Sequence, residues 1–237
     1  MKKIKKITLT VATACVLTAA IPAVTNQYGV SDALAQASVP TLEDTAKVLE
    51  LNSEYYQVKT NIPVLTSMKD TSFQQKLNET IESKTMDLVK EVQREATKGA
   101  QQADEEGYEF HPYVLDVSHE IKSTGDDNLL SIVVETYLYM GGAHGVTIID
   151  TYNVVDDVKT SHVTLEQLLG PDYKVKTRDA VLSAFEKEPY LFYDETSEFE
   201  LDDEQSFYVK DGEVVLIFGQ SEIAPPPAGI LEIPVQN

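Results

Sequence analysis

Hydrophobic residues recur along this chain with two different periods. Over residues 73–92 they return every four or seven positions, which places them on one face of a helix. Thr71 or Ser72 is the expected N-cap of this helix, and Gly99 is the expected stop. The polar, acidic stretch 101–107 is therefore expected to be a loop or a frayed helix end.

Other stretches alternate hydrophobic and polar residues or are rich in β-branched residues, as strands are. They lie at 55–65, 108–121, 129–140, 146–155, 207–209, 214–218 and 230–235. Pro63 interrupts the first stretch, which suggests an edge strand or a bulge. Asp211-Gly212 predicts a tight hairpin turn with positive φ between two of the later strands.

Shorter helices are expected in the second half of the chain. The segment from Thr164 to Gln167 fits a capping box, and Gly170 with the following proline ends that helix. Residues 177–188 predict another helix, which Pro189 closes. We therefore expect an α+β fold, mainly antiparallel sheet with packed helices, in two closely associated modules.

The N-terminus has the order of segments found in secretory signal peptides. An apolar run over 7–24 is followed by small-residue sites that end at Ala35 and Ala37. Four lysines precede the run: Lys2, Lys3, Lys5 and Lys6. We predict a signal peptide over 1–37, hence a secreted, extracellular or cell-wall-associated protein without a stable membrane span after cleavage. The alternative is an uncleaved anchor, because the run is long for a signal.

Composition and charge narrow the candidate partners. The 237 residues, 42% hydrophobic and 24% charged, are typical of a globular protein. Acidic side chains number 39 and basic ones 19, and removal of residues 1–37 would change the charge from −20 to −23. Nucleic acid is therefore an unfavourable partner, whereas a cationic protein or a divalent cation would be attracted. The mature chain has no cysteine, which excludes disulfides and thiolate chemistry.

A glycine-rich string interrupts the strand pattern at Gly141, Gly142, Ala143, His144 and Gly145. Glycines allow backbone amides to approach a ligand, and the imidazole could donate to a sugar hydroxyl or a carbonyl. The alternative interpretation is a turn whose glycines supply positive φ. We divide the mature chain here, into modules at 38–140 and 141–237.

Catalytic and metal motifs are missing from the sequence. No Gly-x-Ser-x-Gly elbow, His-Glu-x-x-His helix or phosphate-binding loop occurs. His111, His119, His144 and His162 lack close ligand spacing, and we predict no metal and no cofactor. The acidic run at 194–204 is expected to be a solvated face with its aromatic residues packed inward, although it could bind Ca²⁺ weakly or attract a basic protein.

The order of these segments resembles that of two modules of secreted bacterial proteins. Residues 55–65 and the helix over 73–92 resemble the PdaC-like (DUF4163) domain of a peptidoglycan deacetylase. Residues 139–145, 165–169 and 207–235 are similar to the DUF3298 domain. The same pair of modules forms the extracellular part of a lysozyme-sensing anti-sigma factor, whose outer domain binds lysozyme.

The resemblance implies ligand contacts in two loops. One is the string 141–145, and the other is the loop with Pro225, Pro226 and Pro227, where relatives often carry an aromatic residue after the first proline. Only six residues precede the apolar run and no deacetylase domain follows Asn237, so we expect neither sigma-factor control nor deacetylase activity.

The sequence therefore favours a non-catalytic binding protein of the cell wall or medium, with lysozyme, another cationic protein or wall peptidoglycan as its partner. The alternatives are a cell-wall hydrolase that uses His144 as a general base, and an accessory module of a wall-modifying enzyme.

Overall fold

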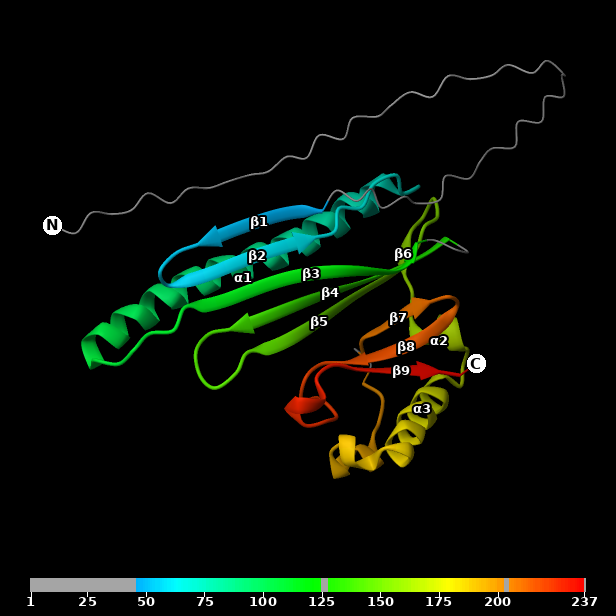
Figure 1. Ribbon diagram of the computed structural model, residues 1–237. Helices are drawn as coiled ribbons and strands as arrows, with labels where there is room; N and C mark the ends of the chain where they lie inside the picture. Colours follow the sequence, from blue (N-terminus) through cyan, green and yellow to red (C-terminus); the bar gives the residue numbers. More distant parts are fainter. Residues whose placement is uncertain (1–45, 125–127, 203–204, 237) are drawn as a thin grey trace, which may run out of the picture.

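The structure is a computed structural model that describes residues 46–124, 128–202 and 205–236 (Figure 1). The predicted signal peptide lies outside these residues.

Six strands form the first sheet in the order in which they follow one another in the chain. They are β1 Lys47–Asn52, β2 Tyr56–Ile62, β3 Tyr113–Thr124, β4 Leu129–Tyr139, β5 Val146–Val155 and β6 Ser161–His162. All neighbours are antiparallel except β2 and β3, which are parallel. Parallel neighbours need a long crossover connection, and here helix α1 supplies it. Pro63 marks the end of β2, which lies between β1 and β3, so the expectation of an edge or a bulge at this proline was wrong.

Helix α1, Thr71–Glu106, covers one face of this sheet. It begins after Asp70, whose carboxylate accepts a hydrogen bond of 2.9 Å from the Phe73 amide, so the N-cap precedes the two residues expected for that role. Gly107, with a φ of 75°, ends the helix.

Gly99 does not end α1, contrary to the sequence-based expectation, and residues 101–106 continue the helix. A Cβ atom at this position would lie 2.8 Å from the Tyr113 hydroxyl oxygen and 3.0 Å from the Phe110 ring. The glycine is therefore explained by the close approach of two aromatic side chains to the helix.

The second sheet is antiparallel, in the order β7 Phe207–Lys210, β8 Glu213–Phe218 and β9 Leu231–Val235. The hairpin between β7 and β8 has the predicted turn, with φ of 52° at Asp211 and 77° at Gly212. Helices α2 Leu165–Leu169 and α3 Tyr173–Lys187 pack on this sheet. Short 3₁₀ turns follow at Pro189–Leu191, Asp194–Glu198 and Pro226–Ala228.

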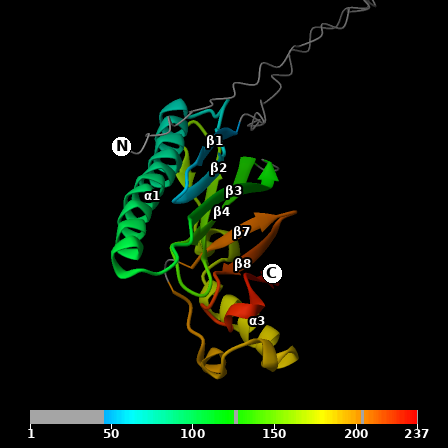
Figure 2. The same ribbon diagram turned by 60° about the vertical axis from the view of Figure 1, so that its left-hand side comes forward.

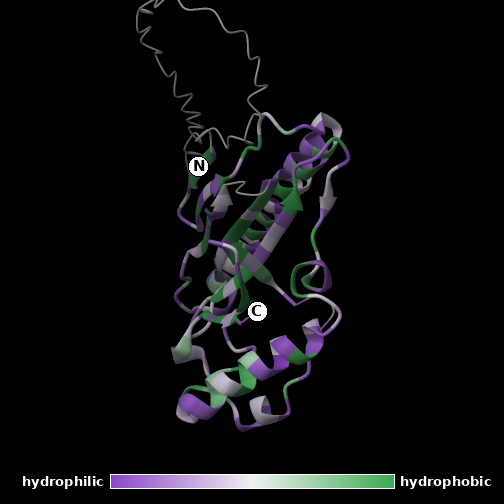
Figure 3. Cartoon of the chain, turned by 90° about the vertical axis from the view of Figure 1, so that its right-hand side faces the viewer, coloured by the Kyte–Doolittle hydropathy of each residue, from purple (hydrophilic) through white to green (hydrophobic). Residues whose placement is uncertain are grey.

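The elements stack in four layers: α1, the first sheet, the second sheet, and α3 with α2 (Figure 2). Hydrophobic and hydrophilic residues are interspersed along the strands, and α3 carries many hydrophilic residues along its length (Figure 3). Strand β8 is buried on both faces, because Leu216 faces the helices while Val215 and Ile217 face the first sheet. This architecture confirms the predicted α+β fold with mainly antiparallel sheet.

The loop 141–145 joins β4 to β5 within the first sheet. The boundary between the sheets therefore follows β6, further along the chain than the division placed at this loop. None of the helices in the described ranges combines the length and apolar character needed to cross a membrane.

Candidate functional site

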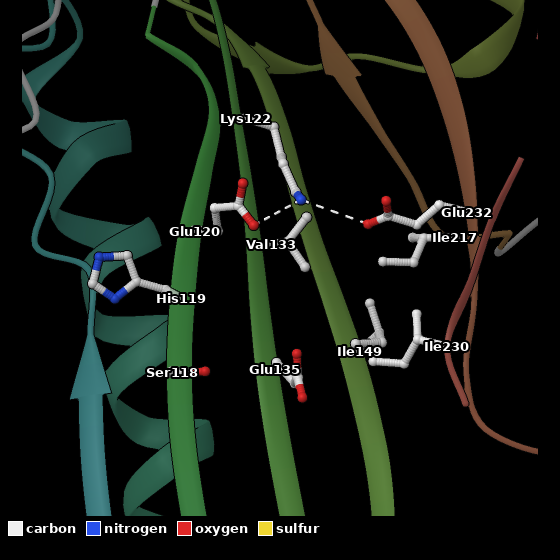
Figure 4. A pocket seen from close by; sticks show the side chains of 10 residues that line it. All are labelled: Ser118, His119, Glu120, Lys122, Val133, Glu135, Ile149, Ile217, Ile230 and Glu232. Carbon is white, nitrogen blue, oxygen red and sulfur yellow. Dashed lines mark hydrogen bonds and ion pairs between the residues drawn. The ribbon is translucent and has the colours of Figure 1, made fainter. Parts of the chain in front are cut away.

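A cleft of about 490 Å³ lies where the outer face of the first sheet meets the second sheet (Figure 4). Its apolar wall consists of Val133, Ile149, Ile217 and Ile230. Its polar residues are Ser118, His119, Glu120, Lys122, Glu135 and Glu232. Three carboxylates against one ammonium group give the cleft an excess of two negative charges.

The alternation of β3 places two of its cleft residues, Ser118 and Glu120, on one face. Ser118 and Glu120 point away from α1, because side chains two apart share a face of a strand. His119 points the opposite way, toward β2 (Figure 4), where its Nδ1 donates a hydrogen bond of 2.9 Å to the Asn61 carbonyl oxygen. This histidine therefore helps to hold β2 against β3.

Lys122 is the extra residue of a β-bulge. The register of β3 and β4 shifts between Ile121 and Ser123, which pair with Ile132 and Ser131. A bulge redirects a side chain relative to the regular ladder. Lys122 extends across the cleft toward the second sheet (Figure 4).

The Lys122 ammonium group links the two sheets. Its Nζ lies 2.8 Å from Glu120 in β3 and 3.5 Å from Glu232 in β9, and 4.6 Å from the ring centroid of Tyr208 in β7. The lysine side chain is only 9% exposed. One cation thus joins strands from both sheets, with a cation–π contact as the third attachment.

Tyr208 is held as a neutral phenol at this junction. Burial, followed by a hydrogen bond to the Glu232 carboxylate and by the charge of that carboxylate, raises the pKa of Tyr208 well above its ordinary value. The phenol therefore serves as a donor to Glu232 at physiological pH.

Glu135 is the carboxylate of the cleft that has no cationic partner among the described residues. It lies in β4 between Ser118 of β3 and Ile149 of β5. Ile230 and Ile149 form the adjoining apolar wall (Figure 4). An exposed, unpaired carboxylate beside apolar side chains suits a ligand that has both an aliphatic stem and a cationic end.

The predicted string 141–145 forms the hairpin loop at the far end of β4 and β5. Gly141 and Gly142 have φ of 92° and 94°, and the Tyr139 hydroxyl donates a hydrogen bond of 3.1 Å to the Gly142 carbonyl oxygen. A Cβ atom at Gly145 would lie 2.6 Å from the Tyr137 ring. All three glycines thus have a conformational or packing reason, and Ala143 is exposed beside them.

His144 is exposed in this loop. Its Nδ1 lies 3.1 Å from the carbonyl oxygen of the neighbouring Gly145, and within the described residues no ion pair joins it to a carboxylate.

The proline loop forms a 3₁₀ turn, in which Pro225 and Pro226 are half-buried and Pro227 is exposed. The Gln220 side chain donates a hydrogen bond of 3.2 Å to the Pro226 carbonyl oxygen. No hydrogen bond between described residues joins this loop to residues 141–145, and neither loop lines the cleft.

The carboxylates of the acidic run are exposed where the structure describes them, and of the three aromatic residues expected to pack inward, Phe192, Tyr193 and Phe199, Phe192 and Phe199 pack on the core of the second sheet. Phe192 lies 6.0 Å from Phe185, and Phe199 lies 5.7 Å from Phe218, as ring-centroid distances. Within the described residues no three His, Cys, Asp or Glu side chains gather in a way that could hold a metal ion.

Two protein families match separate parts of the chain. Residues 49–147 match the family described as Deacetylase PdaC, and residues 166–236 match DUF3298, a protein family of unknown function. No curated protein matches the chain.

Two solved structures of DUF3298 family members are similar over most of their length. The protein from Bacteroides fragilis has a TM-score of 0.61 and 15% identity, and that from Pseudomonas aeruginosa a TM-score of 0.52 and 14% identity. Each match covers 83% of this chain and 91% of the other. At such identities the likeness establishes the fold. The chain therefore contains a PdaC deacetylase-like domain over residues 49–147 and a DUF3298 domain over residues 166–236.

Proposed function

We propose that this protein is a secreted or cell-wall-associated, non-catalytic binding protein whose partner is a basic protein such as lysozyme. The inter-sheet cleft receives a lysine or arginine side chain of that partner. The cationic end pairs with Glu135, and the aliphatic stem packs on Ile149 and Ile230. The proposal that the protein is exported rests on the signal-peptide pattern over residues 1–37.

The observation that carries this proposal is the unpaired Glu135 carboxylate beside an apolar wall. Lys122 forms ion pairs with Glu120 and Glu232, whereas Glu135 has no cationic partner among the described residues. The net charge of −20 adds a long-range attraction for a basic protein. Such a field speeds encounter, while a few desolvated contacts supply the affinity.

Binding without catalysis agrees with the surroundings of the candidate base. His144 lies in an exposed hairpin loop, and within the described ranges no ion pair orients it. The carboxylates that are close together, Glu120 and Glu232, share Lys122 as a common partner, which suits a structural link.

Titration calorimetry with lysozyme at low and moderate salt tests the proposal. Glu135→Gln keeps the shape of the side chain and removes its charge, so we expect about a tenfold rise in Kd at low salt, the scale typical of a lost ion pair at an interface. Glu198→Gln, which removes the same charge from the exposed 3₁₀ turn in the second module, should change Kd by less than about twofold.

Three results would contradict the proposal. If lysozyme does not bind the wild type at either salt concentration, the proposal that such a basic protein is the partner is contradicted. Equal effects of the two substitutions would mean that only overall charge matters and that the cleft is not the contact. Retention of the protein on purified peptidoglycan, unchanged by Glu135→Gln, would favour the wall glycan as the ligand.

A further inference from the structure

A group of aromatic residues lies at the end of the first sheet furthest from β6. We call it the aromatic end patch. Its core is Tyr55 from the β1–β2 turn, Phe110 from the segment after α1 and Tyr113 at the start of β3, whose rings are in contact. Tyr108, two residues before Phe110, and Tyr139, at the end of β4 next to the start of β3, complete the patch.

Ring contacts join Tyr55, Phe110 and Tyr113 at the core of the patch. The Phe110 ring centroid lies 6.2 Å from that of Tyr55 in an edge-to-face arrangement and 5.3 Å from that of Tyr113. Gly99 lets Tyr113 approach α1, since a Cβ atom there would lie 2.8 Å from its hydroxyl oxygen. Tyr139 connects the patch to the glycine loop through its hydrogen bond to Gly142.

The outer rings of the patch are accessible. Tyr55 is 37% exposed and Tyr108 is 50% exposed, although tyrosine side chains usually bury most of their surface. The inner rings Phe110 and Tyr113 are half-buried and give the patch a fixed base. Tyrosine on a rigid base is a side chain that protein interfaces favour, because it contributes area at little cost in conformational entropy.

Carboxylates surround these rings. The Tyr55 hydroxyl is hydrogen-bonded to Glu54, and Asp104 acts on it from the last turns of α1. Glu105, Glu106 and Glu109 follow along the same exposed stretch of chain. A guanidinium or ammonium group placed over a tyrosine face here would meet both the ring quadrupole and a negative charge.

We infer that the aromatic end patch is a second docking surface for arginine or lysine side chains of the basic partner. The inference rests on the proposed function, because it adds a contact for the same class of partner. Charge complementarity supports a cationic protein over a neutral glycan, because the carboxylates beside the exposed tyrosines attract a cation and give a neutral sugar no such advantage. The patch also adjoins the glycine string, whose Gly142 carbonyl oxygen accepts the hydrogen bond from the Tyr139 hydroxyl.

The patch is remote from the cleft. Tyr113 and Lys122 lie nine residues apart on β3, which corresponds to about 30 Å along an extended strand. Substitutions in the two places should therefore act independently, and their effects on Kd should multiply.

Calorimetry with lysozyme on the full chain tests the patch separately from the cleft. We expect the double variant Tyr55→Ala/Tyr108→Ala to raise Kd about fivefold or more, by loss of two cation–π contacts. Tyr55→Leu/Tyr108→Leu retains apolar area without the aromatic face and should weaken binding similarly. Tyr190→Ala, at an exposed tyrosine (76%) of the second module, is the matched control and should leave Kd within about twofold.

The outcomes separate the two proposals. If the wild type binds lysozyme and both double variants bind it as tightly as the wild type does, the patch is not a contact, and the proposed contact in the cleft is unaffected. If the wild type does not bind lysozyme, NMR titration with a deca-arginine peptide decides: resonance shifts at Tyr55 and Tyr108 support a cation-binding patch, and their absence overturns it. Binding to purified peptidoglycan that the double variants abolish would make the patch a glycan site and contradict the inference.

Discussion

The Ser131 hydroxyl donates a hydrogen bond of 2.5 Å to the side-chain oxygen of Asn153, and the pair joins the two sheets. The Asn153 amide nitrogen donates to the Phe207 carbonyl oxygen at 2.7 Å, and the Val209 amide donates to the Ser131 hydroxyl oxygen at 2.9 Å. Both side chains are buried, on neighbouring strands β4 and β5. Two polar residues of the first sheet thus fix the position of β7, and with it the opposite wall of the cleft.

Removal of this pair should destabilise the protein. Asn153→Ala leaves the Phe207 carbonyl and the Ser131 hydroxyl without their partner in a buried place, and Ser131→Ala does the same to the Val209 amide. We expect each to lower the free energy of unfolding by about 1–3 kcal/mol, the typical cost of an unsatisfied buried group. Urea unfolding followed by circular dichroism measures it.

The double variant distinguishes a network from two separate bonds. Ser131→Ala/Asn153→Ala should cost less than the sum of the single losses, because both substitutions break the same bond between the two side chains. Thr97→Ala, which removes an exposed hydroxyl from α1, serves as the control and should stay within about 0.5 kcal/mol of the wild type. Additive losses would contradict the shared network.

Lys122 limits the negative charge of the cleft, so its removal should strengthen the binding of a basic partner. Lys122→Met keeps the length and apolar stem of the side chain but releases Glu120 and Glu232. We expect lysozyme to bind about three- to tenfold more tightly at low salt, with the gain falling at moderate salt. Weaker binding in calorimetry would show that the ammonium group itself contacts the partner.

Gly145 is predicted to be required by the ring of Tyr137. Gly145→Ala would place a Cβ 2.6 Å from ring atoms, so the ring must move. We expect a loss of about 1 kcal/mol in the free energy of unfolding, the lower end of the cost of overpacking. In a Tyr137→Ala background the same substitution should be nearly neutral, and an undiminished loss there would assign the requirement to the backbone instead.

The regular parts of the fold follow from local sequence patterns. The hairpin at Asp211 and Gly212, the strand 146–155 and the capping box at Thr164 were predicted, because turn chemistry and residue periodicity act over a few positions. The end of α1 was not predicted. Gly99 is required by the packing of Tyr113 and Phe110 against the helix, and these residues come later in the chain and reach the helix only in the folded structure.

The cleft could not be predicted for a related reason. The alternation of Ser118, Glu120 and Lys122 predicts a shared face, but the pairing of Lys122 with Glu232 joins residues 110 positions apart and depends on how the two sheets stack. The bulge at Lys122 also leaves no sequence signal. The string 141–145 attracted attention because glycine and histidine are conspicuous in a strand pattern, whereas Glu135 is one carboxylate among 39.

Alkaline pH should destabilise the folded protein through Tyr152. Burial beside α1, followed by the charge of Asp150, raises the pKa of Tyr152 from 10 to about 12. Below pH 10 the phenol is neutral in both the folded and the unfolded chain. Between pH 10 and about 12 the unfolded chain releases a proton that the folded chain retains, so the free energy of unfolding falls as pH rises.

The Tyr152→Phe variant cannot ionise at this position, and its free energy of unfolding should fall less steeply over this interval. Urea unfolding at pH 9, 10 and 11 measures the two slopes, and parallel curves would refute the assignment to Tyr152. Tyr208, whose pKa is also raised by burial and by Glu232, should add to the wild-type slope in the same direction, so Tyr152→Phe/Tyr208→Phe is expected to be flatter still.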